Sequence, residues 1–282
     1  MSVTEHSTRP GVNFAGIWAL FERTALDQLR SRRVLITLGL FALPVAFAGV
    51  LRYYGQGGFS QATAQYEPAF AEYAFILGMI PQGLLPLAAL LFTSGLVQDE
   101  VEGQTLTYLL TRPLPKWSIY AAKLSATYVV LAALSAVAVG VTYAVVAWGQ
   151  PEFWASAGWG RLLRVEGIFS LVLLAYCAIF GYLGLLTRWS LILGVIYILV
   201  LEGLVANIDF VVRKITVRYY GLVLTERSIE RLQPPSAMMD LTNAPEVRGC
   251  VLTLLGIAAV GIAAACWTFA TREFRVKTPE GN

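Results

Sequence analysis

Long apolar runs constrain the fold of this chain more than any other feature. A helix needs roughly 20 mostly apolar residues to cross the hydrocarbon layer of a bilayer. The runs are rich in Leu and Ala and lack the alternation of strands, which favours helices over sheet. The sequence therefore predicts an all-α membrane protein with six transmembrane helices, at residues 34–51, 73–97, 119–148, 165–187, 191–209 and 249–270.

Composition agrees with a lipid environment. Hydrophobic residues make up 57% of the 282 residues and charged residues only 14%, whereas a soluble domain carries about 25% charged residues. We expect a tail and amphipathic helix at 1–33, a six-span transmembrane domain at 34–270 and a tail at 271–282. The segment 211–248, before the last span, mixes apolar and basic residues. We expect it to lie along the membrane–water interface or to re-enter the membrane.

Charges around the first span predict the orientation. Arg30, Arg32 and Arg33 precede this span, while Arg52 alone follows it. Because an excess of Lys and Arg marks the cytoplasmic side, we expect both termini in the cytoplasm and the protein in the plasma membrane. The basic residues of 211–248 argue for the opposite orientation.

An amphipathic helix is predicted before the first span. Steps of three and four residues place a bulky apolar stripe on one helical face, formed by Phe14, Trp18, Phe21, Ala25 and Leu29. We expect this helix to lie along the membrane surface; the alternative is an ordinary beginning of the first span.

Several kinds of catalytic site are excluded. The only histidine is His6, and no Gly–Lys dipeptide occurs, so histidine-based zinc sites, Ser–His or Cys–His dyads and a Walker A loop are absent. Three widely spaced cysteines show no ligand or disulfide spacing. We expect a non-catalytic protein that binds no metal or cofactor itself.

The loop 98–117, between the second and third spans, is longer and has a more definite residue pattern than a simple reversal of the chain requires. Carboxylates at its start favour a helix N-terminus, leucines follow in helical steps, and prolines end the helix. In order, these residues are Asp99, Glu100 and Glu102, then Leu106, Leu109 and Leu110, then Pro113 and Pro115. The sequence predicts a short cytoplasmic helix with an apolar face that must be covered, either by the protein's own bundle or by another protein.

This loop resembles the corresponding loop of ABC type-2 transporter permeases. The matching residues are Glu102, Gly103, Thr105, Leu106, Leu109, Leu110, Pro113, Lys116 and Lys123, with Gln104 inserted in the family's Gly-Thr-Leu. In that family a separate ATPase subunit docks on this helix. The resemblance therefore implies an ATPase-coupling site made of Asp99, Glu100, Glu102, Gly103, Thr105, Leu106, Leu109, Leu110, Arg112 and Pro113.

A second stretch, beginning at Tyr197, is similar to the branch that contains the nitrous-oxide reductase maturation permease. It shares Glu-Gly-Leu at Glu202, then Asn207 and a basic segment. The resemblance implies a permease subunit of an ATP-driven transporter, an exporter, with ATP and Mg bound by the partner ATPase. A second permease subunit, in a homo- or heterodimer, and membrane lipid are the other expected partners, and no nucleic acid is expected.

Glu202 and Asn207 are the candidate intramembrane polar residues. A carboxylate within a span costs about 2.5–3.5 kcal/mol. Glu202 is interpreted either as a gating or substrate-path residue or, preferably, as a structural acid that holds re-entrant segments, with Arg213 or Lys214 as its partner.

Two other functions remain open. A self-sufficient channel or secondary transporter would carry charged residues on several spans and often an inverted repeat, and the sequence shows neither. A membrane-embedded enzyme would need bases or metal ligands that are absent. The transported substrate is not indicated: type-2 relatives move drugs, lipids, polysaccharides and peptides, and one branch supports maturation of a copper enzyme.

Overall fold

Most of the described residues are helical. The computed structural model describes residues 14–56, 72–97, 115–149, 151, 154–187, 189–204, 214–228 and 244–271. None of these residues lies in a strand. The elements are α1 (Phe14–Leu29), α2 (Arg32–Gln56), η1 (Glu72–Leu84), α4 (Leu85–Thr93), α7 (Lys116–Val146), η2 (Trp154–Gly158), α9 (Trp159–Leu186), α10 (Ser190–Tyr197), η3 (Ile198–Leu204), α11 (Val217–Ser228) and α12 (Val247–Thr271).

Five apolar helices are long enough to cross a membrane. They are Arg32–Val50, Ala74–Thr93, Lys116–Val146, Trp159–Leu186 and Val247–Thr271, which overlap five of the six predicted spans. The remaining predicted span, 191–209, overlaps the shorter apolar helix Ser190–Leu204, beyond which residues 205–209 lie outside the described part. The all-α membrane fold is therefore supported, while the count of six spans stays a prediction.

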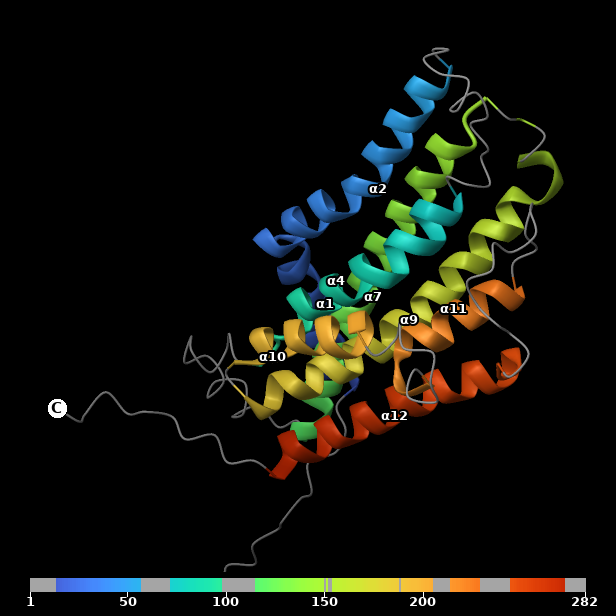
Figure 1. The fold of residues 1–282 in the computed structure, drawn as a ribbon. Helices are drawn as coiled ribbons and strands as arrows, with labels where there is room; N and C mark the ends of the chain where they lie inside the picture. The colour runs from blue at the N-terminus through green and yellow to red at the C-terminus, as the bar shows by residue number, and fades with distance from the viewer. Residues whose placement is uncertain are drawn as a thin grey trace, which may run out of the picture.

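The long helices form a bundle in which α9 is the central element. Figure 1 shows α2, α7 and α9 running side by side, with α12 along the flank of α9 and α11. Among the largest side chains that are less than 2% exposed, ten come from α4, α7, α9 and α12. The exposed surface is also apolar, because large hydrophobic side chains on α2, α10, η3 and α12 are about half exposed or more. An apolar surface of this extent is the one that lipid covers.

At one end of the bundle lie the beginning of α2, the end of α4 and the beginning of α7. We call this end the Lys123 end. Ser190 Oγ at the start of α10 donates to the carbonyl of Ser94, 3.1 Å away. The rings of Tyr120 and Phe269 lie 5.8 Å apart, which places the end of α12 there too. Both residues that flank 98–114 in the described part, Val97 and Pro115, therefore belong to this end.

At the opposite end lie the end of α2, the end of α7 and the beginnings of η1 and α9. We call it the Arg52 end. The guanidinium of Arg52 donates to the carbonyl of Val145, at 3.1 Å, in the last turn of α7 and to the carbonyl of Trp148 in the turn that follows α7. Cations at a helix C-terminus satisfy such carbonyls and interact favourably with the helix dipole. Successive long helices therefore run in alternating directions, as required of helices that cross a bilayer in turn.

The predicted N-terminal helix forms, but its apolar stripe divides between two surroundings. Leu20 is buried and Ile17 and Ala25 pack against the core beside α7. Phe14 and Trp18, by contrast, are 79% and 66% exposed. Ala25 of the stripe therefore packs on the bundle while Phe14 and Trp18 face outward, and the position of the helix along the membrane surface stays a prediction.

Candidate functional site

The carboxylate of Glu202 lies at the centre of a buried polar network. Glu202 is on η3, which continues α10 into the bundle, and its side chain is 1% exposed. Tyr197, one turn earlier, donates its hydroxyl to Glu202 Oε1 at 3.3 Å. The rings of Tyr197 and Phe180 of α9 pack edge to face, 5.5 Å apart, which holds the tyrosine in place.

The same carboxylate caps the N-terminus of α11. The backbone N–H of Val217 donates to Oε1 at 3.2 Å, and that of Arg218 donates to Oε2 at 3.0 Å. The first N–H groups of a helix have no partner within the helix, and the helix dipole favours an anion there. Glu202 thereby satisfies two buried donors that lie 15 and 16 residues further along the chain.

The side chain of Arg218 joins this network to η1. Its Nη1 donates to the carbonyl oxygen of Glu202 at 2.8 Å, and its Nη2 donates to Gln82 Oε1 at 2.6 Å. Gln82 follows Pro81 in the middle of the second apolar helix. One guanidinium therefore links η3, α11 and η1 deep inside the bundle.

The position of α11 makes it a helix that starts inside the protein. Val217, Tyr219 and Val223 are buried against its neighbours, while Ser228 at its far end accepts a hydrogen bond from Arg164 of α9. The segment thus begins at the depth of Gln82 and leads to the Arg52 end. Within 211–248, residues 211–213 and 229–243 lie outside the described part.

A contact between Glu202 and Arg213 stays a prediction, and the described contacts of Glu202 include a cation that the sequence analysis did not name. Lys214 is exposed, and Arg213 lies outside the described residues, as does Asn207. The cation that contacts Glu202 is Arg218, one helical turn beyond Lys214. The position of the α11 N-terminus directs the Arg218 side chain inward. The basic composition of this segment does not reveal which of its cations contacts Glu202.

Sequence reasoning also missed a buried ion pair at the Arg52 end. Glu72 Oε1 accepts hydrogen bonds from Arg161 Nε at 2.5 Å and from the hydroxyl of Tyr143 at 2.6 Å. Glu72 and Arg161 are 89 residues apart, and both side chains are largely buried. The only signal in the sequence was an acid and a base at the predicted ends of spans two and four.

A further acid lies between α7 and α9. Ser135 Oγ donates to Glu166 Oε1 at 2.8 Å, and the hydroxyls of Tyr128 and Ser170 lie 2.5 Å apart on the same pair of helices. Hydrogen bonds of this kind join transmembrane helices where the alternative is a polar group in hydrocarbon. We regard this ladder as packing between the helices.

The residues predicted to couple to an ATPase lie outside the described part of the structure. These are Asp99, Glu100, Glu102, Gly103, Thr105, Leu106, Leu109, Leu110, Arg112 and Pro113. Their helix and its apolar face therefore remain predictions from the sequence. The structure does place their two flanks together at the Lys123 end.

The networks are suited to holding helices together. In the described ranges, no group of three or more His, Cys, Asp and Glu side chains could hold a metal ion. The Glu202 network consists of a capped helix end and hydrogen bonds that join three elements, and it leaves the bundle with a polar centre at mid-depth. Such an arrangement can fix a re-entrant helix or release it when the bundle moves.

The comparisons with known proteins identify the family. No curated protein matches the chain significantly. The family model described as ABC-2 family transporter protein matches residues 18–274, from α1 to just past the end of α12. The match covers the helices described above and the loop whose sequence resembles a type-2 permease. On this ground, the chain is a multi-pass membrane protein that belongs to the ABC-2 family of transporter proteins.

Proposed function

We propose that this chain is the permease subunit of an ATP-driven exporter and that its partner ATPase docks on residues 98–113. The family match supports a permease that works with an ABC ATPase subunit. The observation that carries the docking proposal is that both flanks of the loop lie at the Lys123 end: Leu96 lines one cavity with Arg32 of α2, and the Trp117 carbonyl accepts from the Cys266 thiol of α12. A helix held there is at the same end of the bundle as α1.

In this mechanism the chain transmits force and does not bind nucleotide. Two permease subunits meet in the plasma membrane with the Lys123 end in the cytoplasm, and two ATPase subunits bind ATP and Mg beneath them. Closure of the ATPase pair pushes the 98–113 helix of each permease. The push tilts α4 and α7, which flank the helix, and changes access to a path between the permeases.

Two stretches of sequence support finer parts of the proposal. The acids at 99–102 and the leucines at 106–110 are suited to a groove on the ATPase, because an amphipathic helix docks through its apolar face. The Glu-Gly-Leu stretch at Glu202 is similar to the branch that contains the nitrous-oxide reductase maturation permease, and it supports a relation to that branch. The exposed apolar faces of α2 and α12 are covered by membrane lipid.

The docking proposal is tested by charging the leucine face. The double variant Leu109→Asp with Leu110→Asp is expected to lose co-purification with the ATPase and to uncouple ATP hydrolysis from transport, because two carboxylates cannot enter an apolar groove. Membrane insertion should be unchanged. Co-purification with a co-expressed ABC ATPase subunit and ATP hydrolysis in proteoliposomes are the measurements.

A matched control changes the opposite face of the same helix. Gln104→Asp with Thr111→Asp adds the same charge away from the leucines and is expected to retain the ATPase. If the leucine variant keeps both the ATPase and transport, the coupling assignment is wrong. Transport by the purified chain without any ATPase would favour the secondary-transporter alternative.

A further inference from the structure

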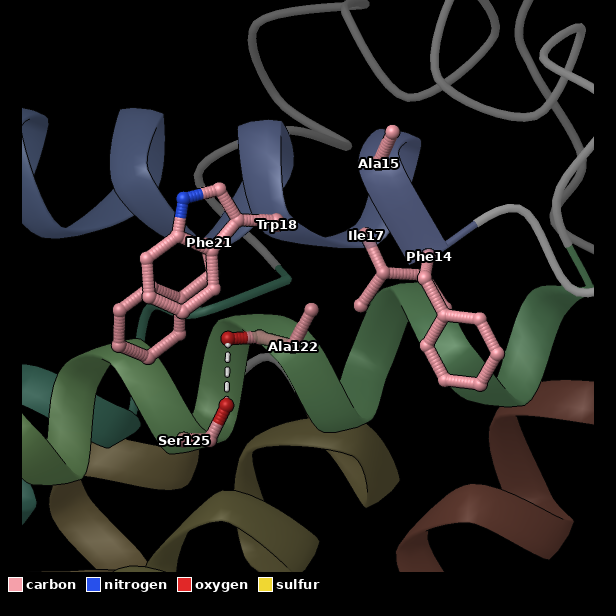
Figure 2. A pocket seen from close by; sticks show the side chains of 7 residues that line it. All are labelled: Phe14, Ala15, Ile17, Trp18, Phe21, Ala122 and Ser125. Carbon is pink, nitrogen blue, oxygen red and sulfur yellow. Dashed lines mark hydrogen bonds between the residues drawn. The ribbon is translucent and has the colours of Figure 1, made fainter.

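Two adjoining hollows lie along α1. The first is a groove of 490 Å³ between α1 and α7, and its lining is almost wholly apolar. Figure 2 shows the rings of Phe14, Trp18 and Phe21 along α1, with Ala122 and Ser125 on α7 beside them. The rings of Trp18 and Phe21 are stacked, 5.4 Å apart. The Ser125 hydroxyl donates to the carbonyl of Ala122 at 2.9 Å, within its own helix.

The second hollow is cationic. It has a volume of 330 Å³ and lies between the α1–α2 turn, the end of α4 and α7. Arg32, Arg33 and Lys123 line it, and Asp27 is the one carboxylate among the described residues of its lining. Lys123 is only 6% exposed, so its charge acts through a poorly screened environment. Among the described residues of the lining, cations therefore outnumber carboxylates.

The two hollows follow one another along the same helices. Phe21 lines the groove and Thr24, less than one turn later on α1, lines the cavity. On α7 the neighbouring residues Ala122 and Lys123 line the groove and the cavity respectively. The surface thus changes from apolar to cationic along the direction of α1. This order complements a phospholipid, whose apolar acyl chain is followed by an anionic phosphate.

We propose that these hollows bind one anionic phospholipid, with its phosphate against Arg32 and Arg33 and an acyl chain against Trp18 and Phe21. Guanidinium groups match phosphate geometry, and the first turn of α2 adds the positive end of its helix dipole. Each hollow falls within the volume range of small-molecule sites. The inference rests on the chain being a membrane protein and is independent of ATPase docking.

The excess of cations selects an anionic lipid. A zwitterionic headgroup brings its own ammonium to a cavity whose described lining has three cations and one carboxylate. A phosphatidylglycerol headgroup brings only negative charge. Each cation near a membrane surface contributes about fivefold to the affinity for anionic lipid.

The test uses the full chain purified in detergent micelles. Phosphatidylglycerol is expected to raise the temperature of thermal unfolding more than phosphatidylcholine with the same acyl chains. Arg32→Gln should weaken the apparent affinity for phosphatidylglycerol about fivefold. Arg30→Gln removes an equal charge two residues away, outside the cavity, and should leave the affinity unchanged.

The acyl chain is tested separately. Phosphatidylglycerol with brominated acyl chains should quench part of the tryptophan fluorescence, and that part should disappear in Trp18→Phe. Trp267→Phe, on the exposed face of α12, is the matched control and should leave that quenching component in place. Quenching that is the same in wild type and Trp18→Phe would overturn the placement of the chain in the groove.

Two results would overturn the proposal as a whole. One is equal stabilisation by phosphatidylglycerol and phosphatidylcholine, or an equal effect of Arg30→Gln and Arg32→Gln. The other is stabilisation by inorganic phosphate or glycerophosphate as large as that by phosphatidylglycerol at the same phosphate concentration. That outcome would assign the cavity to a soluble phosphate and leave the groove without a role in binding.

Discussion

Glu202 shows how a single residue can be tolerated within an apolar bundle. A buried carboxylate is costly unless hydrogen bonds satisfy it. Here two backbone N–H groups of α11 and the hydroxyl of Tyr197 donate to it. The carboxylate and the helix terminus satisfy each other, so removal of either leaves the other buried without a partner.

Glu202→Ala is expected to lower the free energy of unfolding by about 2–4 kcal/mol, because the N–H groups of Val217 and Arg218 lose their acceptor. Glu202→Gln should cost roughly half as much, since its amide oxygen still accepts a hydrogen bond. Thermal unfolding in detergent measures both changes. The control, Glu22→Ala on the exposed face of α1, should have little effect, and an equal loss in all three variants would contradict the capping role.

At the scale of elements, close approach of two helices depends on glycine. A Cβ at Gly184 of α9 would lie 3.0 Å from the carbonyl oxygen of Ser94 and 3.1 Å from that of Thr93. Both are backbone atoms at the end of α4, and they cannot avoid the clash by a change of rotamer as a side chain could. Gly167, on the same helix, has nothing within 4 Å of the equivalent position.

Alanine at these two glycines is expected to act in opposite directions. Gly184→Ala should destabilise the bundle by about 1–3 kcal/mol, because α9 must move away from α4. Gly167→Ala should be neutral or stabilise by up to about 1 kcal/mol, since alanine favours the helix and meets no neighbour. Unfolding temperatures in one detergent compare the two directly; destabilisation of equal size at both sites would show that close packing against α4 is not the cause.

For the whole molecule, the alternating directions of the helices separate two chemically different ends. Arg52 and the Glu72–Arg161 pair tie the helices at one end. The cationic cavity and the flanks of 98–114 lie at the other. If the Lys123 end faces the cytoplasm, the positive residues before the first span and the proposed docking helix lie on the side where ATP is available.

This arrangement predicts which positions an impermeant reagent reaches from outside. In a chain whose Cys177, Cys250 and Cys266 are replaced by alanine, a cysteine at Tyr53 should react in intact cells. A cysteine at Trp117 should react only after the membrane is opened. Both native side chains are exposed in the structure, so the difference should report the side of the membrane.

Two further positions serve as controls on the labelling. Trp148→Cys, at the Arg52 end, should behave like the variant at Tyr53. Trp189→Cys, at the Lys123 end, should behave like the variant at Trp117. Labelling of Trp117→Cys and Tyr53→Cys from the same side would contradict the alternating arrangement, and labelling with the sides exchanged would place the docking loop outside.

Local properties account for the part of the fold that the sequence predicts. Apolar runs of roughly 20 residues indicate membrane helices whatever their neighbours are, and the α1 stripe indicates a helix before the first span. The loop at 98–117 carries the family resemblance in contiguous residues, and the family match agrees with it. Each of these features depends on composition or spacing within one short segment.

The sites between helices could not be derived in this way. Arg218 is selected over the neighbouring cations because α11 starts beside Glu202, and Glu72 meets Arg161 only because η1 and α9 begin at the same end. Likewise, the packed face of α1 is set by α7, and the cationic cavity combines residues from three separate parts of the chain.

By itself, therefore, the sequence determined that this is a membrane protein, that its backbone is helical and that it resembles a type-2 permease. Only the tertiary structure decided which buried charges meet, how α11 begins inside the bundle and where apolar and cationic surfaces adjoin. The physical reason is range: helix formation and membrane insertion depend on neighbouring residues, whereas a buried polar contact depends on helices that approach from distant parts of the chain.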